Sequence, residues 1–137
     1  MMIRFPSTPV LEGGERYLDL TARKQALVAA NLANIDTPGY RTMDFSVELA
    51  MQQSRRREPG LVLNRPHPRH LPGGTPAGWP SPVGEAVDGL PRRNDGNDVD
   101  LDREMLQLSR TAAKFGIAAQ ILRAEFRKLQ HAITEGR

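Results

Sequence analysis

Apolar residues in the last third of the chain recur at alternating steps of four and three positions. The repeat continues without a break through Leu101, Met105, Leu108, Ala112, Phe115, Ala119, Leu122, Phe126, Leu129 and Ile133. A period of 3.5 residues places these side chains on one face of a helix and is typical of a helix that packs along another helix. The pattern predicts a long heptad helix within residues 98–137, and Asp98 and Asp100 are candidate N-caps.

A second, weaker repeat predicts a helix near the N-terminus, from about Glu15 to Ile35. One row of this helix is Leu18, Thr21, Gln25, Val28, Leu32 and Ile35, and a neighbouring row is Leu20, Leu27 and Asn34. A helix with so few apolar residues is marginal alone and needs a partner. Residues 1–14 are expected to be a flexible segment, because prolines and glycines interrupt them.

The N-terminal helix is predicted to end in a tight turn. Thr37 precedes a proline and is therefore disfavoured in the helical region, and Pro38-Gly39 fits the two central positions of a type II turn. Beyond the turn, Met43, Phe45 and Val47 alternate with polar residues, as in a short strand. We assign residues 15–50 to the helix and this turn region.

Residues 51–97 have a different composition and are predicted to form an irregular insert that is flexible or ordered only under some conditions. Eight of the eleven prolines lie there, which is incompatible with a long helix or a central strand. The excess of arginine over acidic residues between positions 54 and 95 also equals the whole net charge of +3. The charge is therefore a property of the insert, and the two ends of the chain are balanced.

The predicted fold is mainly α: two long terminal helices form a coiled-coil-like hairpin around the insert, with a short β element at most. Pairing the helices is the direct way to bury both stripes. The N-terminal side of the predicted seam is Leu20, Leu27, Val28, Leu32 and Ile35. The C-terminal side is Leu101, Met105, Leu108, Phe115, Leu122, Phe126 and Leu129.

Composition and motifs give little support for catalysis or metal binding. The absence of cysteine excludes thiolate metal sites and cysteine nucleophiles, and no apolar run approaches the roughly 18 residues of a membrane span. His67 and His70 flank a proline with no third ligand nearby, and the acidic run that starts at Asp95 lacks the central glycine and closing glutamate of a calcium loop. We expect no enzyme, no cofactor and no metal site. The first residues also lack the apolar core of a secretory signal peptide.

The basic run Arg55-Arg56-Arg57 allows one alternative of a different class, a helical protein that binds nucleic acid or an anionic surface. No nucleic-acid motif and no aromatic ladder accompanies the arginines. A solvated loop or a protein contact explains them more simply, and we predict no nucleic-acid partner.

Asn31 and Asn34 lie three residues apart beside the apolar stripe of the N-terminal helix. Asparagine is a poor helix former and is costly to bury without hydrogen bonds. Two interpretations follow. The side chains cap a frayed helix end, or they make specific hydrogen bonds that fix the register of an interface.

Two segments resemble the flagellar rod, hook and hook-associated family of axial proteins, and most closely its proximal rod proteins. The first is Ala-Asn-Leu-Ala-Asn-Ile-Asp-Thr-Pro-Gly-Tyr-Arg, residues 30–41, which contains the motif residues Asn31, Asn34, Thr37, Pro38, Gly39 and Tyr40. The second is Asp-Gly-Asn-Asp-Val-Asp-Leu-Asp-Arg-Glu-Met, residues 95–105, which leads into the C-terminal helix. The similarity extends over roughly residues 16–49 and 94–134, a little more than half of the chain.

The resemblance implies a structural subunit of the bacterial flagellar basal body that assembles helically through its terminal helices. It also implies export through the flagellar type III apparatus, a place in the periplasm-spanning rod, and contacts with copies of itself and other rod proteins. The adaptor FliE, the basal-body ring and the export gate are further implied partners. Another rod protein of the same family, such as FlgC, is the alternative within this class.

Overall fold

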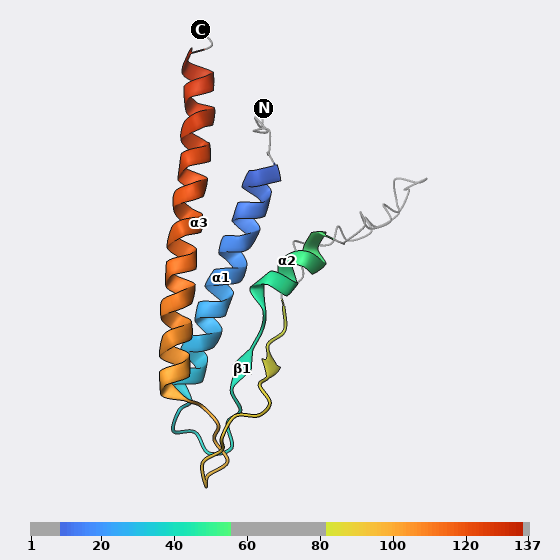
Figure 1. The fold of residues 1–137 in the computed structure, drawn as a ribbon, viewed down its shortest axis with the longest axis vertical. Helices are drawn as coiled ribbons and strands as arrows, with labels where there is room; N and C mark the ends of the chain where they lie inside the picture. Colours follow the sequence, from blue (N-terminus) through green and yellow to red (C-terminus); the bar gives the residue numbers. More distant parts are fainter. Residues whose placement is uncertain (1–8, 56–81, 136–137) are drawn as a thin grey trace, which may run out of the picture.

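The computed structural model describes residues 9–55 and 82–135. In these ranges the chain forms, in order, the elements α1 (Pro9–Ala33), β1 (Met43–Asp44), α2 (Val47–Arg55), β2 (Glu85–Ala86) and α3 (Leu101–Glu135). Helices α1 and α3 run side by side in opposite directions, and the β ribbon and α2 lie along one side of the pair (Figure 1). The predicted mainly-α fold, with two long terminal helices and a very small β element, is confirmed.

Helix α1 begins at Pro9, six residues before the predicted start at Glu15, so part of the segment predicted to be flexible is helical. A proline is tolerated in the first turn of a helix because its missing N–H has no helical partner there. Gly14 has a packing role: a Cβ atom at this position would lie 2.2 Å from Cδ1 of Leu122. The missing side chain therefore leaves the space in which Leu122 of α3 meets α1.

Helix α3 starts at Leu101, as predicted. Asp100 is its N-cap, because its carboxylate accepts a hydrogen bond from the backbone N–H of Arg103 at 3.1 Å. The helix has 35 residues against 25 in α1, a difference of about 15 Å at the usual rise. Its C-terminal end therefore projects past the start of α1 (Figure 1).

The strand-like alternation after the turn is only partly realised. Met43 and Asp44 pair with Ala86 and Glu85 in an antiparallel ribbon of two residues per strand. The chain then turns into α2 instead of continuing as a strand, because the Ser46 hydroxyl caps the new helix by accepting a hydrogen bond from Leu49 N–H at 3.2 Å. Two parts of the predicted insert thus have defined structure: the end of α2, and the stretch from residue 82 to residue 97.

The apolar core is small and is divided between two sides of α1. On one side, Leu20 is fully buried with Val47 and Ala50 of α2. On the other side, α1 meets α3, whose buried residues are Glu104, Thr111, Ala118 and Leu122. In the described part of the chain, no helix is long and apolar enough to cross a membrane.

This arrangement corrects the predicted seam in two ways. Leu20 packs against α2, and Leu27 lies against the backbone of Gly84 just before β2, so both belong to the α2 side of α1. On α3, the row that faces α1 is centred on Glu104, Thr111 and Ala118, to one side of the apolar heptad row. The physical reason is that polar partners at the base of the helix pair fix its rotation.

Candidate functional site

The side chain of Asn31 uses its full hydrogen-bonding capacity at the base of the helix pair, where it is 1% exposed. Its amide nitrogen donates to the Met43 carbonyl at 2.8 Å and to the Glu104 carboxylate at 2.9 Å. Its amide oxygen accepts from Met43 N–H at 3.1 Å and from the Tyr40 hydroxyl at 3.2 Å. Asn31 therefore pairs with the free edge of β1 as a neighbouring strand would, and at the same time joins α1 to α3.

The two sequence motifs meet in space below the helices. Asn97 is buried, and its amide nitrogen donates to the carbonyls of Asn34 and Thr37 at 2.9 and 2.8 Å. The backbone N–H of Gly39 donates to the Asp95 carbonyl at 2.9 Å. The second motif thus closes over the end of α1 and over the turn that follows it.

The predicted type II turn is confirmed. Tyr40 N–H donates to the Thr37 carbonyl at 3.2 Å, and Gly39 has a φ of 71°, which favours glycine. Gly96, with a φ of 82°, lies so close that a Cβ there would be 3.4 Å from the Cα of Gly39. The two glycines allow the two loops to touch through their backbones.

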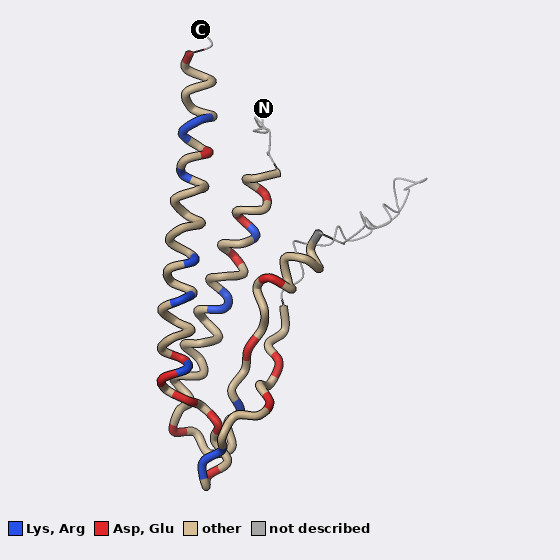
Figure 2. The backbone as a smooth tube through the Cα atoms, viewed as in Figure 1, with Lys and Arg blue, Asp and Glu red and all other residues tan. Residues whose placement is uncertain are grey.

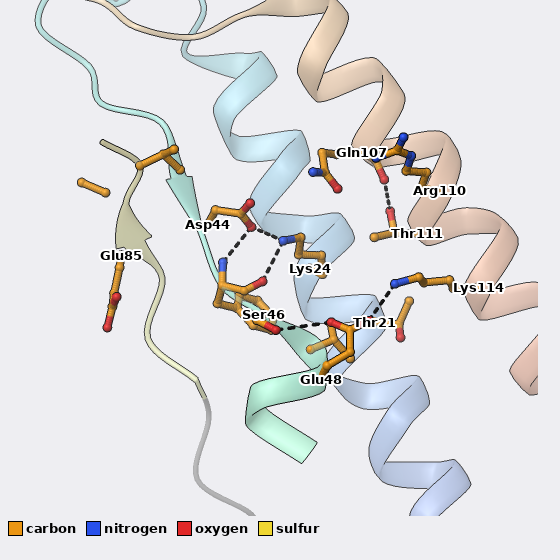
Figure 3. Close-up of a pocket in the computed structure, with 14 residues that line it drawn as sticks. Thr21, Lys24, Asp44, Ser46, Glu48, Glu85, Gln107, Arg110, Thr111 and Lys114 are labelled. Carbon is orange, nitrogen blue, oxygen red and sulfur yellow. Dashed lines mark hydrogen bonds and ion pairs between the residues drawn. The ribbon is translucent and has the colours of Figure 1, made fainter. Parts of the chain in front are cut away.

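A chain of charged groups continues the contact into the space between the helices and β1. Lys24 pairs with Asp44 and also donates to the Phe45 carbonyl at 2.7 Å (Figure 3). The second carboxylate oxygen of Asp44 meets Arg103 at 3.0 Å, and Arg103 also pairs with Glu104. With Asn31 bound to Glu104, this network ties α1, β1 and α3 together.

Asp98 joins the second motif to the strand region. It is 3% exposed, and its carboxylate accepts from the backbone N–H of Thr42 at 2.5 Å and lies 3.6 Å from the Arg41 guanidinium. Burial raises the pKa of Asp98, but the hydrogen bonds from Thr42 and the charge of Arg41 outweigh it, so the pKa lies below its usual value. The ionised form is therefore the one that the fold stabilises.

Asp98→Asn is expected to destabilise the protein at neutral pH and to flatten its loss of stability in acid. Because the folded-state pKa is depressed, the carboxylate stabilises the fold above its unfolded pKa of about 3.9, and this contribution disappears as the pH falls through the folded value. Denaturant unfolding at pH 7 and pH 3 measures the difference. Asp88→Asn is the matched control, since Asp88 also pairs with Arg41 but its side chain is 92% exposed. Equal effects of both substitutions at pH 7 would contradict the role given to Asp98.

The same region influences Tyr40. Burial, followed by the nearby Glu104 carboxylate, raises the pKa of the Tyr40 hydroxyl above its ordinary value. The hydroxyl therefore stays protonated at neutral pH and remains a hydrogen-bond donor to Asn31.

A polar groove lies between α1, α3 and the β1–α2 segment, and its ionic groups are largely paired across it (Figure 3). Lys24 bonds to Asp44, and Lys114 of α3 bonds to Glu48 of α2 at 2.8 Å. The described residues contain no group of three side chains that could hold a metal ion. The arrangement connects helices, and it presents no assembled nucleophile and base.

Leu122 is the one buried member of the apolar heptad row of α3, and the other members are partly or largely exposed. Leu122 is 8% exposed, whereas Leu101, Met105 and Phe126 are each about half exposed, at 51%, 49% and 51%. Leu108, Phe115 and Leu129 are intermediate. Of the remaining predicted seam residues, Val28 is buried and Leu32 and Ile35 are partly buried.

Asn31 shows that the second interpretation of the asparagines holds for one of them within the subunit. Asn34 follows the first interpretation, because its side chain donates to the Ala30 carbonyl at 2.8 Å and accepts from the Thr37 hydroxyl at 3.1 Å, both close in sequence. The sequence did not predict Lys24 and Thr42, whose only signal is a polar residue inside or beside an apolar stripe. Asn97, Asp98 and Glu104 lie in the second motif, but their buried contacts with the first motif could not be predicted from it.

Some of the sequence predictions lie outside the described residues. These include the histidine pair at 67 and 70 and the arginines at 56, 57, 65 and 69. His131, the one histidine among the described residues, is exposed on α3.

The described part of the chain is a terminal helix pair, tied at its base by buried polar contacts and carrying a partly exposed apolar row, which is the architecture of a subunit that packs along other helices. Comparison with known proteins gives the class. A family model for flagella basal body rod proteins matches residues 18–41, the stretch that holds most of α1 and the turn.

Full-length relatives identify the family more closely. The chain is 33% identical to flagellar basal body rod protein FlgB of Salmonella typhimurium, over 89% of this chain and 91% of the relative. It is 31% identical to FlgB of Yersinia enterocolitica, over 92% and 97% of the two chains. It is also 31% identical to FlgB of Borrelia hermsii, over 83% and 87%. The chain belongs to the FlgB family of flagellar basal body rod proteins, and its role is that of a structural rod subunit.

Proposed function

We propose that this chain builds the proximal part of the flagellar rod and assembles helically through its terminal helices. One observation carries the proposal: the apolar row of α3 keeps its heptad spacing from Leu101 to Ile133, yet several members are about half exposed in the subunit. A side chain that is half exposed gains on the order of 1 kcal/mol when a neighbouring subunit covers the rest. Repeated along the helix, this burial favours assembly.

The position of the exposed row on α3 supports the same proposal. Met105 is nine residues from Lys114, or about two and a half helical turns, so it lies on the opposite side of the helix. Lys114 bonds to Glu48 of α2. The exposed part of the row therefore points away from α2 and the β ribbon and is open to a second chain.

The polar character of the contact between α1 and α3 supports export before complete folding. Glu104 and Thr111 of α3, with Thr21 and Asn31 of α1, are among its buried residues. Such a contact depends on precise hydrogen bonds and supplies little apolar burial. The isolated subunit is therefore only partly ordered: its polar base is folded, and assembly completes the helix ends far from that base. This suits passage through the flagellar type III apparatus into a periplasm-spanning rod.

The residues proposed to serve assembly are those of the apolar rows and of the turn motif. In this proposal the exposed members of the α3 heptad row contact adjacent subunits, while Leu122, Asn31, Asn34 and Thr37–Tyr40 fix the shape that makes the contact possible. The partners are copies of this chain, other rod proteins, the adaptor FliE, the basal-body ring and the export gate.

Two measurements test the proposal: detection of the chain in purified basal bodies, and circular dichroism of the isolated chain. We expect the chain to be present at the base of the rod, located by an epitope tag, and the isolated chain to show less helix than the structure holds. Absence of the chain from purified basal bodies would overturn the proposal. A fully helical, thermally stable monomer would overturn the idea that assembly completes its folding.

A further inference from the structure

Helix α1 carries an exposed face that no described part of the subunit covers. This face, called here the α1 outer face, consists of Glu12, Glu15, Ala22, Ala26, Ala29 and Ala33. These residues recur at steps of three, four and seven and so share one side of the helix. Ala26 lies two positions from both Lys24 and Val28, which are buried, so the outer face points away from the interior.

Helix α3 has a matching exposed face. This α3 outer face consists of Leu106, Ala113, Ile117, Arg123 and Arg127. Ala113 is nine residues from buried Glu104, about two and a half turns, so it lies on the side opposite to α1. Leu106 and Ile117 are 50% and 60% exposed, which is unusual for large apolar side chains in the middle of a helix.

The two outer faces carry opposite charges at the same level of the molecule. Because Leu122 packs on Gly14, the first turns of α1 are level with the stretch of α3 around Arg123. Figure 2 shows charges of both signs at these ends of α1 and α3; on the two outer faces themselves they are Glu12 and Glu15 on α1 and Arg123 and Arg127 on α3. Within the described chain, neither Glu12 and Glu15 nor Arg123 and Arg127 form an ion pair.

We propose that the α3 outer face of one copy docks on the α1 outer face of a second copy that points in the same direction. In that orientation Arg123 and Arg127 face Glu12 and Glu15 of the neighbour, and Leu106 and Ile117 cover its exposed alanines. The alanines permit a close approach of the two helices. Reversing the neighbour would place Glu12 and Glu15 near exposed Asp102 at the start of α3, where like charges repel.

This contact is heterologous, since two different faces meet, so each copy keeps one free face for a further copy. It therefore produces a ring or a helix rather than a closed dimer. The inference rests on the proposed assembly into the rod and adds to it the identity of the neighbour and the faces that join.

Charge exchange in flagellated cells tests the contact. One variant carries E12R and E15R, and a second carries R123E and R127E. Each alone places like charges across every contact, so we expect about a tenfold or greater loss of the chain from purified basal bodies and a similar loss of swimming. Combining all four substitutions in one chain should restore incorporation to within about twofold, because the pairing is exchanged.

Co-expression of the two variants is the decisive arm. In alternating order, each basic face meets an acidic one, so incorporation should again recover. A double variant with E85R and R92E changes the same kinds of residue at exposed positions elsewhere and should behave as the unaltered chain. Normal incorporation of the E12R/E15R variant and of the R123E/R127E variant, each expressed alone, would overturn the proposed contact. Recovery in the chain with all four substitutions, without recovery when the two variants are co-expressed, would also overturn it. Absence of the unaltered chain from basal bodies would instead overturn the proposed function.

Discussion

Replacing Asn31 with alanine is expected to lower the free energy of unfolding by about 3 kcal/mol, because several buried groups lose their partner at once. The backbone N–H and carbonyl of Met43, the Tyr40 hydroxyl and the Glu104 carboxylate all bond to this one side chain. The site is 1% exposed, so water cannot readily replace the amide. Denaturant unfolding followed by circular dichroism measures the loss.

The substitution Asn31→Asp separates the loss of hydrogen bonds from the loss of side-chain volume. The carboxylate fills the same space and can still accept from Met43 N–H and the Tyr40 hydroxyl, but it donates nothing and meets the charge of buried Glu104. We therefore expect Asn31→Asp to be at least as destabilising as Asn31→Ala at neutral pH.

Asn34→Ala is the matched control, because the side chain of Asn34 bonds only to neighbours in sequence. Its cost should stay near 1 kcal/mol or below, as for the loss of a partly exposed hydrogen bond. Similar losses in Asn31→Ala and Asn34→Ala would show that Asn31 does not join the elements in the way described.

The long terminal helices could be predicted because their signals are local. The 3.5-residue repeat, Asp100 before Leu101 and the Pro38-Gly39 turn are all readable within a few residues. The start of α1 could not be predicted, since Pro9, Gly13 and Gly14 indicate a break in the helix. Gly14 is favourable in this helix because Leu122, which is distant in sequence, occupies the space that a side chain would fill.

The rotation of the helix pair was beyond prediction for a different reason. A heptad pattern identifies an apolar side of a helix but does not say which part of it faces the partner inside the subunit. In this chain buried Glu104 is bound by Asn31 and Arg103, and these bonds turn α3 so that part of the apolar row stays exposed. The hydrogen bond between Asn31 and Glu104 joins residues 73 positions apart, and a single sequence does not reveal such a pairing.

The apolar row left exposed is therefore informative about function. In a protein that acts alone, a heptad row of this length would be buried by its own chain. Here buried polar residues occupy part of the side of α3 that faces α1, and the apolar surface that they displace remains available to other subunits. In the proposed assembly, the residues that shape the subunit are therefore distinct from those that contact its neighbours.

Leu122→Asp is expected to abolish rod assembly and swimming while the chain is still secreted. Leu122 is 8% exposed and fills the space over Gly14, so aspartate would place a charge between the upper parts of α1 and α3. An unpaired buried carboxylate costs several kcal/mol, which exceeds what this small contact can supply. The helices separate there, and the surface formed jointly by them is lost. Export should continue, because in the proposed route the chain is exported before the two helices pair.

Gln130→Asp is the control that separates this effect from a general effect of charge. Gln130 is exposed on the projecting end of α3, so aspartate there adds the same charge without entering the contact between the helices. We expect swimming close to normal in Gln130→Asp and no swimming in Leu122→Asp. Secretion is measured separately, in strains that cannot complete the rod, and both variants should reach the culture medium there in comparable amounts. Normal swimming of Leu122→Asp would show that the packing of Leu122 on Gly14 is dispensable in the assembled rod. Loss of Leu122→Asp from the medium would instead place its defect at export, before the helices pair.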